Sequence, residues 1–333
     1  MKDKTADVKA HGKAIPSKLS EFALNNKALI ILLILCLIAA IISPAFFTSR
    51  NLMNVVRQVC ASSILGIGFT LVIASANLDL SVGYMLGMVG VIMGLLSRAD
   101  VPFMLVLLAG IACGAICGLI NGLVGIKFKL PLFIVTLATG QVYKGACQLL
   151  SNTSPVNGLQ EEFKVLGQGY LGPIPIPVYI MAAVLLVLYV LLNKTRFGRH
   201  AIATGGNAEA ARTSGINTGA VTVAVYVIMG ICTAIAAMVM TGRAFSAQPA
   251  AGQGMEMDAI AAVVIGGTSL SGGTGHIVGT VIGCLIVGVI NNILNLAAVN
   301  SNWQLVAKGL MILTAVLLDV ASSRYFNQKL KKA

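Results

Sequence analysis

The chain has 333 residues, of which 57% are hydrophobic and only 10% are charged, and its mean hydropathy is +0.90. A soluble domain carries roughly 25% charged residues, so this composition excludes a water-soluble fold. The apolar runs have the length of helices and do not alternate, which favours spanning α-helices over a β-barrel. We therefore expect an all-α polytopic membrane protein.

The formal net charge of +12 does not indicate nucleic-acid binding. Basic residues gather in tails and short loops between apolar runs, as is typical of membrane orientation, and aromatic residues are not interleaved with them. The seven cysteines lie mostly in apolar runs and are interpreted as helix-packing residues rather than disulfides or metal ligands. The first 27 residues are polar and lysine-rich, and no cleavable signal peptide is evident among them.

Ten apolar segments are expected to cross the membrane, two of them short and interrupted by glycine. In chain order they cover residues 28–47, 61–75, 84–96, 103–125, 130–150, 174–193, 220–240, 259–267, 277–296 and 305–320. They define a transmembrane permease domain over residues 28–320, between terminal tails at 1–27 and 321–333.

The positive-inside rule predicts that both tails are cytoplasmic, because this orientation places 16 of the 23 basic residues on the inner side. Residues 151–173 then form an external loop that suits a docking or lid segment. Residues 194–219 form a cytoplasmic loop that contains a short predicted helix. Asn207 is a good N-cap for this helix, Glu209 complements its dipole, and Gly215 suits its C-terminal end. The loop either docks on a partner or is an ordinary connector.

Candidate pathway residues are the polar side chains and glycines at membrane depth, where buried polar groups are costly. Asp79 follows the second segment and either lines a polar pathway or holds the broken backbone. Asp258 opens the eighth segment, where capping of that helix is the favoured interpretation over a functional role. Neutral polyhydroxylated solutes are bound by hydroxyls, amides and peptide groups. The other candidates are Asn77, Ser81, Gly266, Gly267, Ser269, Ser271, Asn291 and Asn292, and for most of these helix packing is an equally good explanation.

Motifs for catalysis are missing from the sequence. It contains no phosphate-binding G-x-x-x-x-G-K-[ST] loop, no nucleophile elbow and no cluster of histidines and acids. We expect no cofactor, no metal and no enzymatic activity. Intramembrane acids and histidines are also too few for a typical proton- or sodium-coupled carrier, so the energy for transport should come from a partner.

The cytoplasmic loop resembles the coupling loop of ribose-type sugar ABC permeases. Glu209-Ala210-Ala211 with Gly215 matches the E-A-A-x-x-x-G core of binding-protein-dependent permeases, although the I-x-L-P ending of the longer pattern is absent. The resemblance extends over nearly the whole chain through Asn77-Leu-Asp-Leu-Ser-Val-Gly83, Phe133-Ile-Val-Thr-Leu-Ala138, Ser246-Ala-Gln-Pro249 and Met257–Gly273. Asn77 departs from the family, which often carries glycine there.

The resemblance implies a monosaccharide permease, with ribose the favoured substrate, in a bacterial inner membrane. It also implies a homodimer with the pathway between the copies, a cytoplasmic double-domain ATPase that binds ATP, and a periplasmic or lipid-anchored sugar-binding protein. Coupling to the ATPase would use Asn207, Glu209, Ala210, Ala211, Arg212, Ser214 and Gly215. The alternatives are a permease of the same fold for a nucleoside or a furanone signal, and a carrier that works without an ATPase.

Overall fold

The computed structural model describes residues 27–330, and the side chains of residues 28–317. The predicted N-terminal tail, apart from Lys27, and residues 331–333 of the C-terminal tail lie outside the described residues. The elements in chain order are α2 (Lys27–Ile42), α3 (Ser49–Ala74), α4 (Val82–Arg98), α5 (Phe103–Phe128), α6 (Leu132–Ser151), α7 (Glu161–Gln168), β1 (Tyr170–Leu171), β2 (Ile174–Pro175), α8 (Ile176–Lys194), α9 (Arg196–Gly206), α10 (Ala208–Thr213), α11 (Thr218–Ala244), α12 (Met255–Ile265), α13 (Ile277–Leu296) and α14 (Ser301–Leu330).

Five of these helices are long and apolar enough to cross a membrane by their length and composition. They are α3, α5, α8, α11 and α13. Residues 28–42 of α2 and all of α4 are shorter apolar helices. Strand structure in the described residues is limited to the small β1–β2 hairpin and one isolated bridge. The expectation of an all-α membrane protein is therefore confirmed at this level.

Each of the ten predicted apolar segments falls largely within a helix, but several boundaries differ. Helix α2 ends at Ile42, not at residue 47, because Pro44 follows and the chain turns through residues 43–48. Helix α3 begins at Ser49, twelve residues before the predicted start, because its first three turns carry polar residues that lower the local hydropathy. Thr48 caps this helix by accepting a hydrogen bond from the Asn51 N–H.

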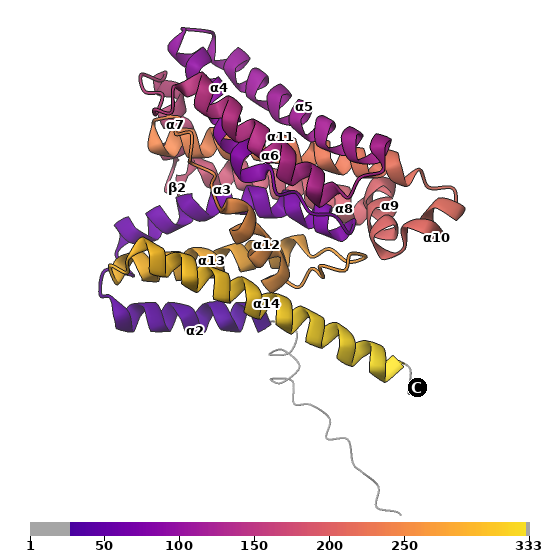
Figure 1. Ribbon diagram of the computed structural model, residues 1–333. Helices are drawn as coiled ribbons and strands as arrows, with labels where there is room; N and C mark the ends of the chain where they lie inside the picture. Colours follow the sequence, from indigo (N-terminus) through magenta and orange to yellow (C-terminus); the bar gives the residue numbers. More distant parts are fainter. Residues whose placement is uncertain (1–26, 331–333) are drawn as a thin grey trace, which may run out of the picture.

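The interior of the molecule is built around α3, α4 and α11, whose side chains are largely buried. Helix α3 contacts α8, α11, α12 and α13, whereas α5 and α8 expose most of their apolar surface, as expected of helices that face lipid. Figure 1 shows α9 and α10 at one end of the helical bundle, and α7 with the β1–β2 hairpin at the opposite end.

A non-helical segment leads into α12. After α11, the backbone of Ala247 pairs with Val156 in an antiparallel bridge, and residues 249–252 then run along α4, where the Gly252 and Gly83 backbones touch. Helix α12 follows with only 11 residues, or about 16 Å at 1.5 Å per residue. That length covers about half of a hydrocarbon core roughly 30 Å thick. The eighth predicted segment is thus a half-length helix that follows a series of turns at residues 249–254.

Candidate functional site

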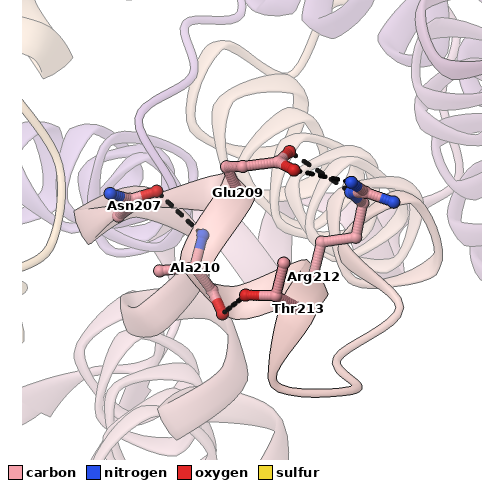
Figure 2. Close-up of polar contacts among 5 residues, drawn as sticks. All are labelled: Asn207, Glu209, Ala210, Arg212 and Thr213. Atoms are coloured by element: carbon pink, nitrogen blue, oxygen red, sulfur yellow. Dashed lines mark hydrogen bonds and ion pairs between the residues drawn. The ribbon is translucent and has the colours of Figure 1, made fainter.

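Helix α10 begins with a side-chain cap. The Asn207 side-chain oxygen accepts a hydrogen bond of 2.9 Å from the Ala210 N–H (Figure 2). This bond satisfies one of the N–H groups left free at a helix start, which is why asparagine is favoured there. The short helix predicted over residues 207–216 is present at 208–213.

Helix α10 ends at Thr213, and Gly215 follows its C-cap Ser214 with a φ of +85°, in the left-handed region. The Gly215 N–H donates to the Arg212 carbonyl and the Ile216 N–H to the Ala211 carbonyl, both at 3.0 Å. These two bonds form a Schellman motif that satisfies the last carbonyls of the helix. A residue with a Cβ would be strained at this position, so glycine here has a backbone reason.

The surface of α10 is almost entirely exposed, and Ala211 is its one buried residue. Arg212 donates two hydrogen bonds to the Glu209 carboxylate, at 2.6 and 3.2 Å, as Figure 2 shows. The Arg212 guanidinium holds the pKa of the Glu209 carboxyl below its ordinary value, chiefly through these bonds and also through its charge. Glu209 therefore stays ionised at neutral pH, and the exposed face of α10 carries a fixed pair of opposite charges.

Helix α9 connects α10 to two breaks in the membrane helices, residues 75–81 after α3 and residues 266–276 after α12. Gly205, near the end of α9, lies so close to the Ala74 carbonyl at the end of α3 that a Cβ would overlap it. The same carbonyl accepts a hydrogen bond of 3.0 Å from the Gly273 N–H in the loop between α12 and α13. We name these contacts of Ala74, Gly205 and Gly273 the α9 junction. Through it, the two breaks meet at the end of α9, the helix that directly precedes α10.

The pathway candidates near the α9 junction are Asn77 and the α12–α13 loop. The Asn77 amide bonds back to the Ser75 carbonyl and hydroxyl. Gly266 and Ser269 are half-buried, whereas Gly267 and Ser271 are exposed. Four of these five candidates lie in the α12–α13 loop, which contacts the end of α9 through Gly273.

Asp79 and Ser81 lie elsewhere, in the interior. One Asp79 oxygen accepts hydrogen bonds from the Ser81 N–H at 3.0 Å and from the Ser81 hydroxyl at 2.6 Å. The Asn121 amide donates to the same hydroxyl, and Thr139 and Tyr143 donate to the Asn121 carbonyl oxygen. Both Asp79 and Ser81 are fully buried. These contacts favour the second of the two interpretations of Asp79, in which its side chain stabilises the non-helical backbone between α3 and α4.

Asp258 does not cap α12. The N-cap is Gly254, and the Asp258 carboxylate pairs with Lys308 of α14 at 2.8 Å instead. The capping interpretation was therefore wrong, because the sequence does not show that Asp258 and Lys308 lie side by side. The Asn291 amide also approaches this carboxylate, at 3.5 Å. Neighbouring Asn292 points elsewhere and exchanges two hydrogen bonds with the side chain of Asn51 on α3, at 2.8 and 3.0 Å.

The predicted site residues thus form separate groups. The coupling residues share α10 and its caps, the candidates of the α12–α13 loop lie with Asn77 at the α9 junction, and Asn291 lies by Asp258 deeper in the bundle. Gly205 and Lys308 were not among the predicted site residues. A glycine pair before the capping asparagine and a lysine within an apolar run were the available signals for them.

Comparison with known proteins identifies the family. The family described as "Branched-chain amino acid transport system / permease component" matches residues 51–316. The chain belongs to this family. It is 42% identical over 300 residues to the ribose import permease protein of Escherichia coli (strain K12), covering 89% of this chain and 94% of that protein. It is 43% identical over 290 residues to the ribose import permease protein of Bacillus subtilis (strain 168), covering 86% and 90%.

More distant relatives also carry sugar names. The D-allose transport system permease protein of Escherichia coli (strain K12) is 38% identical over 291 residues, covering 86% of this chain and 89% of that protein. No solved structure matches the chain. The resemblance drawn from the coupling loop is therefore confirmed. As a transport permease, the chain is a multi-pass membrane protein and a non-catalytic subunit whose family works with an ATPase and a solute-binding protein.

Proposed function

We propose that this chain is the membrane-spanning subunit of an ATP-driven importer of a monosaccharide, with ribose as the substrate. The identity of more than 40% to two ribose import permeases, over most of their length, carries this proposal. The family model also names amino-acid transport, but the relatives cited above all carry sugar names. A thermal-shift screen of the cognate binding protein tests the substrate: stabilisation by D-ribose is expected, and stabilisation by nucleosides alone would contradict it.

The proposed topology has ten crossings in a bacterial inner membrane, with both termini in the cytoplasm. Two observations support it. Helix α10, from the loop with four basic residues, lies at the opposite end of the bundle from α7 (Figure 1). Helices α3, α4, α5 and α6 are joined by connections of only three to seven residues, so successive helices in this part of the chain alternate in direction. In this topology residues 151–173 face outward, where α7 and the hairpin offer a docking surface for a binding protein.

Helix α10 is proposed to be the lever that an ATPase moves, in a complex that contains two copies of this permease. The exposed surface of α10, its Glu209–Arg212 ion pair and the caps at both of its ends suit a short, rigid helix that inserts into a partner. The membrane pathway is proposed to involve Asn77, Asp79, Ser81, Gly266, Gly267, Ser269, Ser271, Asn291 and Asn292. For Asp79 and Ser81 the buried hydrogen bonds imply that they shape the pathway rather than touch the solute.

Substitutions in α10 test the coupling role. Glu209→Lys replaces the charge pair by two like charges, and Gly215→Asp places a Cβ at a φ of +85°. Both variants should insert normally into the membrane and lose most of the ATP hydrolysis that the loaded binding protein stimulates. Normal stimulation in both variants would refute the coupling assignment.

A further inference from the structure

A groove lined by apolar side chains runs along the surface between α8 and α11, and its volume is about 320 Å³. Both helices contact α3, which lies in the interior. The lining consists of residues 183–191 on one side of α8 and residues 228–235 on one side of α11. Val187, in this lining, is 63% exposed. In a membrane the groove is therefore open to the surrounding lipid.

The groove is about as long as one leaflet of a bilayer is deep. Residues 183–191 span about 12 Å of α8 at 1.5 Å per residue. Half of a hydrocarbon core is roughly 15 Å thick. These residues lie mostly in the C-terminal half of α8 (Ile176–Lys194), which is the cytoplasmic half in the proposed topology. The groove thus has the length and the depth to hold an acyl chain of the cytoplasmic leaflet.

Basic residues lie at the cytoplasmic end of the groove. Val187, Leu191 and Lys194 follow one another at spacings of four and three, so Lys194 continues the row of lining residues on α8. Helix α9 starts two residues later and contacts both α8 and α11. Its exposed side carries Arg196 and Arg199, three residues apart. All three basic side chains are exposed and within reach of a headgroup whose acyl chain fills the groove.

The positive charge at this end of the groove is not balanced by the protein. Among the side chains of residues 28–317, neither Lys194 nor Arg196 nor Arg199 takes part in a salt bridge. The first turn of α9 contains no acidic residue, although the dipole of a helix favours negative charge at its start. Lysine and arginine at the cytoplasmic surface of a membrane attract anionic lipids. A lipid phosphate would supply the missing negative charge.

We propose that the groove between α8 and α11 binds an acyl chain of an anionic phospholipid, and that Lys194, Arg196 and Arg199 bind its phosphate. The apolar groove favours a lipid over free phosphate, because phosphate alone would leave the groove empty. Long basic side chains keep their apolar stems along the helix while the charged group reaches the headgroup. The bound lipid links the end of α8 to α9, the helix that precedes α10. This binding does not depend on which solute the chain transports.

The experiment is a lipid titration of the purified, delipidated full chain in detergent, read by native mass spectrometry. Dioleoyl phosphatidylglycerol and dioleoyl phosphatidylcholine are compared, because they have the same acyl chains and differ in net headgroup charge. The wild-type chain should bind phosphatidylglycerol about tenfold more tightly. Lys194→Gln and Arg199→Gln should each lower this preference about fivefold, the contribution of one basic residue near an anionic lipid surface. Lys127→Gln, which removes an exposed charge at the end of α5, is the matched control and should keep the preference.

A second pair of variants tests the apolar part of the site. Ala183→Leu places a larger side chain in the groove at an exposed position, so the fold should be kept and both lipids should bind about fivefold more weakly. Ala182→Leu is the matched control, because Ala182 is equally exposed but lines a different depression, between α8 and the start of α13. It should bind both lipids like wild type.

Equal binding of the two lipids by the wild-type chain would overturn the proposal, and so would equal weakening by Ala182→Leu and Ala183→Leu. Two further results would assign the same features to other partners. If Lys194→Gln and Arg199→Gln keep the lipid preference but no longer co-purify with the cognate ATPase, the basic residues bind the ATPase instead. If Ala183→Leu converts a dimer to a monomer without changing lipid binding, the groove is a contact between two copies. None of these results bears on the import function, which uptake assays measure separately.

Discussion

Asp258 and Lys308 form an ion pair between α12 and α14 that is largely shielded from solvent. The side chains are only 14% and 28% exposed, and the two atoms lie 2.8 Å apart. Removing one partner leaves a charge without compensation, which costs far more than replacing both partners by apolar residues. The link between α12 and α14 therefore depends on Lys308, in addition to the apolar packing of α12 against α3 and α13.

A double-mutant cycle measures this dependence. Lys308→Met alone should destabilise the protein by about 3 kcal/mol, because the Asp258 carboxylate is left unpaired. The double variant Asp258→Leu/Lys308→Met should recover most of that loss. The measurement is the thermal unfolding of the purified chain in detergent, with Thr314→Leu on the exposed side of α14 as the control. A double variant that is less stable than Lys308→Met would show that the pair is not the source of the effect.

The sequence alone identified the charged residues whose burial at membrane depth costs free energy, but it did not identify their partners. Asp79 and Asp258 were both singled out by their charge. Lys308 lies 50 residues from Asp258, and Asn51 lies 241 residues from Asn292. Such pairings depend on how the helices pack, and no local pattern encodes them.

Among the elements, α10 was predicted most accurately, because its signals are local. An asparagine cap, an acid in the first turn and a terminal glycine act within one or two turns of the backbone. The start of α3 was missed because residues 49–60 are helical but polar, and spans were located by apolar length. Helix α7 was not predicted either, because eight residues within a polar loop give little periodicity.

The α9 junction can be tested at the scale of elements, because the neighbouring glycines Gly205 and Gly206 differ in how closely other atoms pack against them. A Cβ at Gly205 would overlap the Ala74 carbonyl, whereas at Gly206 its nearest neighbour would be 3.8 Å away, an ordinary contact. Gly205→Ala should therefore separate α9 from the two breaks and lower sugar uptake at least tenfold, while ATP binding to the partner stays normal. Gly206→Ala should transport like wild type. Equal uptake by the two variants would show that the junction does not transmit movement.

At the scale of the whole molecule, the proposed topology places α10 and the loop of residues 151–173 on opposite sides of the membrane. Single cysteines at two exposed positions test this, Ser154→Cys in that loop and Thr213→Cys at the end of α10. Of the native cysteines, five are buried and two are half-buried, so their background labelling should be low. A membrane-impermeant thiol reagent should label Ser154→Cys in intact cells, and Thr213→Cys only after permeabilisation. Labelling of both in intact cells would contradict the orientation.

The order of the apolar segments was predictable because lipid requires long runs of apolar residues, and such runs are visible in sequence. The half-length helix α12 was recognised only as a short segment. The path of residues 249–252 along α4 and the pairing of α12 with α14 arise from tertiary packing, which one sequence does not show. Helix α10 and its caps were therefore predictable at the residue level, and the surroundings of α12 were not.

The central claim is that this chain imports a sugar only as part of an ATP-driven complex. Proteoliposomes are prepared with the chain and its cognate binding protein, with and without the cognate ATPase, and uptake of labelled D-ribose is measured with ATP supplied on the side of the ATPase. We predict uptake that requires the ATPase, the binding protein and ATP together. Equal uptake by the chain without the ATPase would contradict the claim and identify a carrier that works alone.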